Sequence, residues 1–174
     1  MPSSIFDKIE IAQGDITKFK VDAIVNAANK GLLGGGGVDG AIHRAAGPEL
    51  LKYCKTIGGC STGEAVISPG YRLFAKNVIH TVGPIYSGAE EDKLFLANCY
   101  ESSLKLAAEH GAVSVAFPAI SCGVYGYPVE GACGIAVNTV CDFLKTDKRL
   151  NKVIFVLYSL KYLKVYADFI ASIS

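Results

Sequence analysis

The sequence predicts an α/β sandwich with a largely parallel inner sheet. Short apolar stretches typical of strands alternate along the chain with longer stretches of helical periodicity. The run NKVIFVLYS at 151–159 is apolar on consecutive positions, as in a parallel strand that is buried on both faces. The 174 residues fit one domain, which we expect to span residues 1–174 without a linker.

The first part of the chain is predicted to hold two strands and two helices. Residues 5–13 alternate roughly between apolar and polar positions, which indicates a half-exposed strand, and the apolar run 22–26 indicates a buried one. A long glycine-rich loop follows, and a helix begins at Val38. Gly47 ends this helix, and Pro48 begins the next because the fixed φ of proline suits the first helical position.

The rest of the chain continues the alternation. The further strands are expected at 63–68, 77–82, 113–117 and 151–159. The further helices are expected at 90–110, 129–145 and 160–172, the first of which ends at Gly111 as its C-cap.

Composition excludes several classes of protein. Hydrophobic residues make up 51% of the chain, which is enough to bury a core and argues against disorder. The net charge of +1 argues against a dedicated nucleic-acid or membrane-surface binder. No apolar run reaches the ~18 residues of a membrane span, and the N-terminus does not resemble a signal peptide. We therefore expect a cytoplasmic protein, or a nuclear one in a eukaryote.

The cysteines and histidines show no metal-binding spacing. The six cysteines contain no C-x-x-C pair, and the three histidines contain no H-x-x-x-H or H-E-x-x-H. We therefore expect free thiols in a reducing compartment, most of them in the core, and no zinc site.

Glycine is the unusual component, at 19 of 174 residues. Seven glycines lie within residues 31–47, and two more flank the Val-Tyr pair at 123–126. Both clusters follow a predicted inner strand, which is where open α/β sheets bind ligands. Glycine lets the backbone approach an anion closely, and N–H groups at a helix start donate to it, so the two loops together suit a diphosphate. The alternative is two ordinary flexible loops.

The stretch GGGVDG at 35–40 matches the G-x-G-x-x-G pattern of dinucleotide-binding folds, but its context does not. In those folds the loop directly follows its strand, whereas here residues 26–34 intervene, and the confirming acidic residue about 20 positions later is missing. We therefore disfavour a dinucleotide-dependent oxidoreductase. The chain also lacks G-x-x-x-x-G-K-[ST], which excludes ATP hydrolysis by a P-loop.

Polar side chains lie beside both glycine clusters. Asn26 and Asn29 precede the first, where an amide either binds a sugar hydroxyl or favours a turn. Asp39, near a helix start, either stabilises the helix dipole or orients a water or a ribose hydroxyl. Asp15 either caps a turn or accepts a hydrogen bond from the amine of a base. Tyr125, within the second cluster, either packs under its loop or stacks on a sugar or base.

Five stretches of the chain resemble the macrodomain family, and most closely its MacroD-type branch of ADP-ribosyl hydrolases and O-acetyl-ADP-ribose deacetylases. They are QGDIT (13–17), VNAAN (25–29), GGGGVDGAIHRAAG (34–47), IHTVGP (79–84) and PAISCGVYGYP (118–128). The resemblance spans almost the whole chain in the same motif order. It implies a three-layer α/β/α sandwich around a mixed sheet of about six strands. It also implies that no metal or organic cofactor is used.

The resemblance further implies roles for individual residues. Asn29 and Asp39 match residues implicated in catalysis, and Tyr125 matches the aromatic that positions the distal ribose. Asp15 matches the contact to the adenine amino group, and Tyr158 matches the aromatic near adenine. The positions implied to bind ADP-ribose are Asp15, Ile16, Ala27, Gly36, Gly37, Val38, Ser121, Cys122, Gly123, Val124, Gly126 and Tyr158.

Two positions depart from the family pattern. Cys122 stands where relatives usually have Thr, and we interpret it as a small loop-lining thiol because no motif ties a histidine to it. Tyr158 is followed by Ser159, where relatives often carry an acid. This second departure affects the adenine end of the site and leaves the catalytic loops intact.

The implied reaction is hydrolysis of an ester at the distal ribose, with water held between Asp39 and a phosphate oxygen. The expected partners are ADP-ribose, O-acetyl-ADP-ribose and proteins that carry mono-ADP-ribose on Glu or Asp. We expect no nucleic-acid or membrane partner, and a monomer. The alternative function is a non-catalytic ADP-ribose reader, but readers tend to lose the acid that this chain keeps as Asp39. An RNA binder would need a basic, aromatic-lined track, against which the net charge argues.

Overall fold

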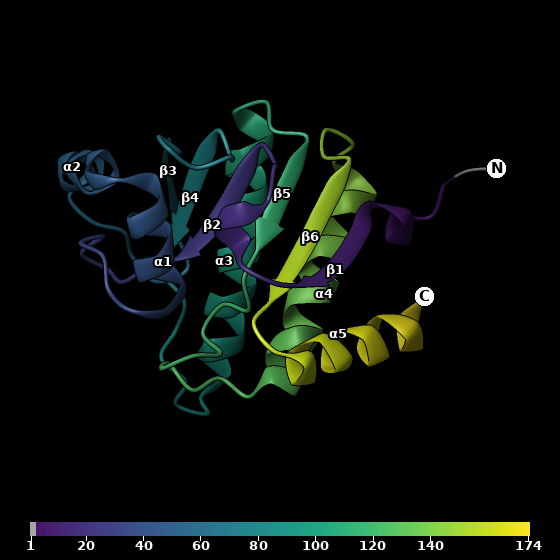
Figure 1. Cartoon of the computed structure of the whole chain (residues 1–174). Coiled ribbons are helices and arrows are strands. Elements are labelled where there is room, and N and C mark those ends of the chain that lie inside the picture. Colours follow the sequence, from purple (N-terminus) through teal and green to yellow (C-terminus); the bar gives the residue numbers. More distant parts are fainter. Residues whose placement is uncertain (1–2) are drawn as a thin grey trace.

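The computed structural model describes residues 3–174, which surround a six-stranded sheet (Figure 1). The strands are β1 (Ile9–Gln13), β2 (Ala23–Ala27), β3 (Ala65–Pro69), β4 (Asn77–Thr81), β5 (Ser114–Phe117) and β6 (Lys152–Leu157). Their order across the sheet is β1-β6-β5-β2-β4-β3. All neighbouring strands are parallel except the edge strand β3, which runs antiparallel to β4. The predicted mixed, largely parallel sheet is therefore confirmed.

Five α-helices cover the two faces of the sheet, so the predicted three-layer α/β/α sandwich is also confirmed. They are α1 (Gly37–Ala46), α2 (Pro48–Ile57), α3 (Glu90–Glu109), α4 (Val129–Thr146) and α5 (Leu160–Ile173). Helices α1 and α2 pack on one face, and α3, α4 and α5 pack on the other (Figure 1). No helix within residues 3–174 is both long and apolar enough to span a bilayer.

The strand predicted at 5–13 is correct only from Ile9 onward. Residues 5–8 form the 3-10 helix η1 (Ile5–Lys8), because Ser4 and Asp7 make a capping box. The Ser4 hydroxyl accepts a hydrogen bond from the Phe6 N–H at 3.2 Å, and the Ser4 N–H donates to the Asp7 carboxylate at 3.0 Å. Local hydrogen bonds between side chain and backbone thus override the alternating pattern.

The sequence pattern does not predict the second 3-10 helix, η2 (Ile16–Lys18). Asp15 precedes it as the N-cap and accepts a hydrogen bond from the Thr17 N–H at 2.9 Å. This short element turns the chain out of β1 and brings Asp15 and Ile16 to the rim of the sheet where the ligand loops lie.

The sheet topology brings the two glycine clusters together. Strands β2 and β5 are parallel neighbours, with Ile24 opposite Ala116. The loop that follows β2 contains the first glycine cluster, and the loop that follows β5 contains the second. Because the carboxyl ends of parallel strands meet at one edge, the loops leave the sheet side by side.

Candidate functional site

A cleft of about 940 Å³ opens between the two glycine loops, a size typical of small-molecule sites. Its walls contain every predicted site residue except Gly126. Gly126 instead closes the turn of the second loop, with a φ of 73° and an N–H that donates to the Gly123 carbonyl at 3.0 Å. The lining residues that sequence reasoning did not name as site residues are Gly14, Ala28, Gly35, Ala41, Arg44, Gly83, Pro118, Ala119, Val156 and Tyr162.

The first glycine loop is held against the N-terminus of α1 by a close backbone contact. A Cβ atom on Gly40 would overlap the carbonyl oxygen of Gly35, so only glycine lets the loop lie this near the helix. The first-turn N–H groups face the cleft without another acceptor within residues 3–174; they belong to Gly37, Val38 and Asp39. Together with the helix dipole, these donors favour an anion at this wall.

The second loop provides a comparable set of donors on the opposite wall. Ser121 adopts a φ of 66°, and its hydroxyl donates to a backbone carbonyl at 2.8 Å, which fixes the start of the turn. In the described part of the chain, three successive N–H groups of this turn have no acceptor; they belong to Gly123, Val124 and Tyr125. Two walls of free N–H groups thus face one cleft, an arrangement that suits a diphosphate.

Asp39 lies between these walls and is only 6% exposed. Its Oδ1 accepts a hydrogen bond from Asn26 Nδ2 at 2.8 Å and lies 3.4 Å from His43 Nε2. Its Oδ2 makes no hydrogen bond to residues 3–174. One oxygen therefore holds the carboxylate in place, and the other is free to accept a hydrogen bond from a water or a ribose hydroxyl.

Asn29 lines the same part of the cleft as Asp39. Its Nδ2 donates to the Gly34 carbonyl at 2.8 Å, which braces the first glycine loop. Its side-chain oxygen makes no hydrogen bond within the described residues and remains an acceptor for a ligand hydroxyl. Both interpretations offered for this residue, the structural and the ligand-binding one, therefore fit the geometry.

Asp15 lies at the other end of the cleft and also combines two roles. Its Oδ1 accepts hydrogen bonds from the Thr17 hydroxyl at 2.7 Å and from the Thr17 N–H at 2.9 Å. The Thr17 hydroxyl lowers the pKa of the Asp15 carboxyl, although burial opposes the shift, so the group is ionised at neutral pH. Asp15 Oδ2 makes no hydrogen bond within residues 3–174 and is free for the amine of a base.

The position after Tyr158 explains one departure from the family pattern. Ser159, at a position where the resemblance implies an acid, is the N-cap of α5 and accepts a hydrogen bond from the Tyr162 N–H at 3.2 Å. The Tyr162 hydroxyl donates to the Cys122 carbonyl at 3.0 Å and thereby ties α5 to the second loop. Tyr158 itself is 91% exposed at the rim, where its ring can stack on a ligand.

Cys122 lies within the second loop and is 8% exposed. Burial raises the pKa of its thiol to about 12, so the thiol stays protonated at neutral pH. A protonated thiol is a poor nucleophile, which agrees with the interpretation of Cys122 as a loop-lining residue.

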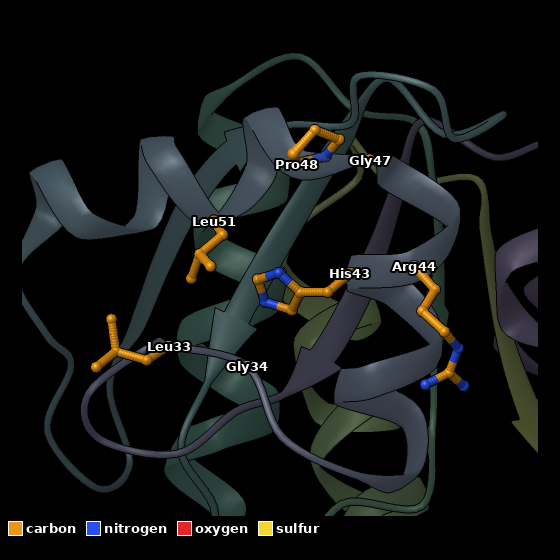
Figure 2. A pocket seen from close by; sticks show the side chains of 7 residues that line it. All are labelled: Leu33, Gly34, His43, Arg44, Gly47, Pro48 and Leu51. Carbon is orange, nitrogen blue, oxygen red and sulfur yellow. The ribbon is translucent and has the colours of Figure 1, made fainter.

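A smaller hollow of about 350 Å³ lies beside the first loop (Figure 2). The His43 ring points into it between Leu33 and Leu51. Arg44 borders both this hollow and the main cleft, and it is the one lysine or arginine on the cleft wall within the described residues. Its guanidinium adds a positive charge to a site that otherwise relies on backbone N–H groups.

Sequence reasoning missed the side chains that hold Asp39. His43 follows Asp39 by four residues on α1, and this spacing, which places two side chains on one helix face, is a signal that would have found it. The sequence indicates only a sugar ligand or a turn former at Asn26, yet this residue is fully buried and donates to Asp39. Its role depends on the packing of α1 over β2, for which the sequence has no local signal.

Comparison with known proteins adds independent information. The family described as "Macro domain" matches residues 25–136 of this chain. A macro domain-containing protein of Chlorobaculum tepidum is 54% identical over 173 residues, with 99% of both chains covered. The O-acetyl-ADP-ribose deacetylase of Salmonella gallinarum is 53% identical over 165 residues, with 92% of both chains covered.

The ADP-ribose glycohydrolase MACROD2 of Homo sapiens is 54% identical over 166 residues, and the match covers 94% of this chain but 39% of that protein. Among solved structures, a variant of the Oceanobacillus iheyensis macrodomain with ADP-ribose has a TM-score of 0.93 at 43% identity, covering 99% of this chain and 97% of that chain. The Trypanosoma brucei macrodomain in complex with ADP-ribose has a TM-score of 0.90 at 43% identity, covering 94% of this chain and 69% of that chain.

Proposed function

Because the chain belongs to the macrodomain family, we propose that it binds ADP-ribose in the main cleft and hydrolyses ester bonds at the distal ribose. The substrates are O-acetyl-ADP-ribose and proteins that carry mono-ADP-ribose on glutamate or aspartate side chains. The observation that carries the proposal is the Asp39 carboxylate, which is buried, held at one oxygen and unpartnered at the other.

The proposed orientation of the ligand follows from the distribution of donors and acceptors. The diphosphate lies between the two walls of free N–H groups, with Arg44 nearby. The adenine extends toward Asp15 and Tyr158, and the distal ribose extends toward Asn29 and Asp39. Backbone donors explain how a chain with a net charge of +1 can bind a doubly negative ligand.

The proposed reaction adds one water across the ester. A water held between Asp39 Oδ2 and a phosphate oxygen of the ligand attacks the bond, and the products are ADP-ribose and a free carboxylic acid. Asn29 and Tyr125 hold the ribose in the reactive orientation, so positioning supplies much of the acceleration. No step requires a cofactor.

The experiment that tests the function is incubation with a protein that carries mono-ADP-ribose on acidic residues, and separately with O-acetyl-ADP-ribose. Serine- and arginine-linked proteins are the controls. We expect release of ADP-ribose from the ester-linked substrates and none from the controls. Binding of ADP-ribose without any release would instead indicate the reader function.

The matched variant is Asp39→Ala, measured for both release and affinity. We expect release to fall about 100-fold or more, because the residue that orients the water is lost. ADP-ribose affinity should change by less than about tenfold, or 1.4 kcal/mol, since the backbone donors remain. Unchanged release by the variant would contradict the role of Asp39.

A further inference from the structure

A series of buried polar side chains, joined by hydrogen bonds, lies behind Asp39 on the side away from the cleft. Asn26 on β2 and His80 on β4 stand opposite each other in the parallel register, and both are 0% exposed. They share the α1/α2 face with Ser68 on β3, which is 1% exposed. None of these three side chains lines the main cleft, so none of them contacts substrate.

A donor and an acceptor can be assigned for each hydrogen bond among these side chains, starting from Asn26. Asn26 Nδ2 donates one hydrogen to Asp39 Oδ1 at 2.8 Å and lies 3.1 Å from His80 Nδ1. Turning the amide would place its oxygen against the carboxylate, which would be repulsive, so Nδ2 must face Asp39. The second amide hydrogen then goes to His80 Nδ1, which acts as an acceptor.

The proton on the other side of the His80 ring can be placed by the same reasoning. Because Nδ1 accepts, the His80 proton is on Nε2, which lies 2.9 Å from Ser68 Oγ and donates to it. The Ser68 hydroxyl in turn donates to the Pro69 carbonyl at 3.2 Å. Asn26 therefore donates to Asp39 on one side and to His80 on the other. From His80 the donors continue through Ser68 to the backbone of β3.

The surroundings of His80 keep its ring neutral. Burial lowers the pKa of His80 to about 4, and His43, whose ring centroid is 6.5 Å away, adds to the shift. The other groups that face the ring are Asn26, Ser68 and Cys54, whose Sγ lies 3.8 Å from Nε2. The ring is thus uncharged at neutral pH and offers Nδ1 as an acceptor.

We propose that His80 is a positioning residue for the hydrolysis, acting through Asn26 to hold Asp39 with Oδ2 toward the cleft. This inference rests on the function proposed above. The Asn26 side-chain oxygen has no hydrogen-bond partner within the described residues, so only its two donated hydrogen bonds orient the amide. Loss of the acceptor at Nδ1 would leave a buried N–H unpaired and free the amide to turn away from Asp39.

The test compares His80→Leu with His80→Asn. The two replacements are similar in size, but only asparagine places an acceptor oxygen near the position of Nδ1. We expect His80→Leu to lower kcat about tenfold or more with ADP-ribose affinity retained, and His80→Asn to recover most of that loss. Equal kcat for His80→Leu and the natural protein would overturn the proposal.

A double-mutant cycle separates positioning from a general structural role. If His80 acts through Asp39, His80→Leu should cause no further loss of kcat in an Asp39→Ala background. The same fold loss in both backgrounds would overturn the proposal. Should His80→Leu fail to fold in a thermal melt, Ser68→Ala is the second variant. It removes the acceptor of the Nε2 hydrogen, and we expect a loss of kcat of about threefold that also disappears without Asp39.

The release of ADP-ribose by the natural protein is measured before any variant is compared, and it tests the proposed function. If it releases no ADP-ribose from any ester, the hydrolase function and this proposal are both overturned. If it does release ADP-ribose and the His80 and Ser68 variants match it, only the positioning role is overturned.

Discussion

The face of the sheet beneath α3, α4 and α5 and the face beneath α1 and α2 are both buried, yet they contain different kinds of side chain. The first holds a cluster of aromatic rings whose centroids lie 5.0 to 6.4 Å apart, formed by Tyr100, Phe117, Phe155 and Tyr166. The second buries Asn26, His80 and Ser68 behind the Asp39 carboxylate. The same sheet therefore separates bulk packing from the orientation of a functional group.

This difference predicts that substitutions on the two faces have different main effects. On the aromatic face, a loss of packing should lower the free energy of unfolding and leave the activity of each folded molecule intact. On the polar face, a small displacement should lower activity more than stability, because the geometry of Asp39 depends on it. Four measurements test this distinction.

The largest effect is expected for Phe155→Ala. Phe155 is fully buried, and its ring centroid lies 5.2 Å from that of Tyr166 and 6.2 Å from that of Phe117. We expect the free energy of unfolding in a denaturant titration to fall by about 3 to 5 kcal/mol. The kcat per folded molecule at low temperature should stay close to that of the natural protein. A large drop in kcat would break the separation between the faces.

The second effect is a dependence of stability on pH that belongs to the polar face. The folded pKa of His80, about 4, lies below its ordinary value of 6.5, so the unfolded state binds more protons between these values. The stabilisation of the folded state by the neutral His80 ring is fully present above pH 6.5. It is lost as the pH falls toward 4, by up to about 3 kcal/mol. Denaturant titrations near neutral and at acidic pH should show a smaller decrease in the free energy of unfolding for His80→Asn than for the natural protein.

The third effect concerns Gly40→Ala, at the contact between α1 and the first glycine loop. An added methyl would displace the Gly35 carbonyl, and we expect kcat/KM to fall about 10- to 100-fold with the fold retained. The matched control is Gly134→Ala within α4, where the new Cβ would lie 3.8 Å from the Phe169 ring, an ordinary contact. A loss of activity in the control, or none at Gly40, would contradict the comparison.

The smallest effect is expected for Tyr162→Phe, which removes the hydrogen bond from α5 to the Cys122 carbonyl. We expect ADP-ribose affinity in a calorimetric titration to weaken by about 1 kcal/mol, because the second loop becomes less firmly held. Tyr53→Phe on α2 is the control, since the Tyr53 hydroxyl has no partner among the described residues and the side chain is 37% exposed. Equal affinities for both variants would show that α5 does not organise the loop.

Much of the fold followed from periodicity in the sequence. The strand at β6 was recognisable because it is apolar on consecutive positions, and α2 because Pro48 stands at its start. The 3-10 helix η1 could not be recognised from periodicity, since the capping box of Ser4 and Asp7 forms it. The sequence pattern also does not specify strand order, because pairs such as Ile9 with Val153 join residues far apart in the chain.

The candidate site was predictable where its residues are local to the glycine loops. Asp39 and Tyr125 could be selected because each lies within or beside a glycine cluster. Their catalytic roles stay predictions until variants are measured. Arg44 and Tyr162 were missed because their place on the cleft wall depends on how α1 and α5 pack, and His80 was missed because its role depends on strand register.

The register pair of Asn26 and His80 also has a consequence for how the chain folds. Side chains in a strand alternate between faces, so a slip of β2 by one residue past β4 would turn Asn26 toward the opposite core. There it would lie in the apolar core on the α3, α4 and α5 side of the sheet, with its amide desolvated and its hydrogen bonds to His80 and Asp39 broken. The polar pair thus penalises misaligned strands, and it favours a single pairing of β2 with β4 during folding.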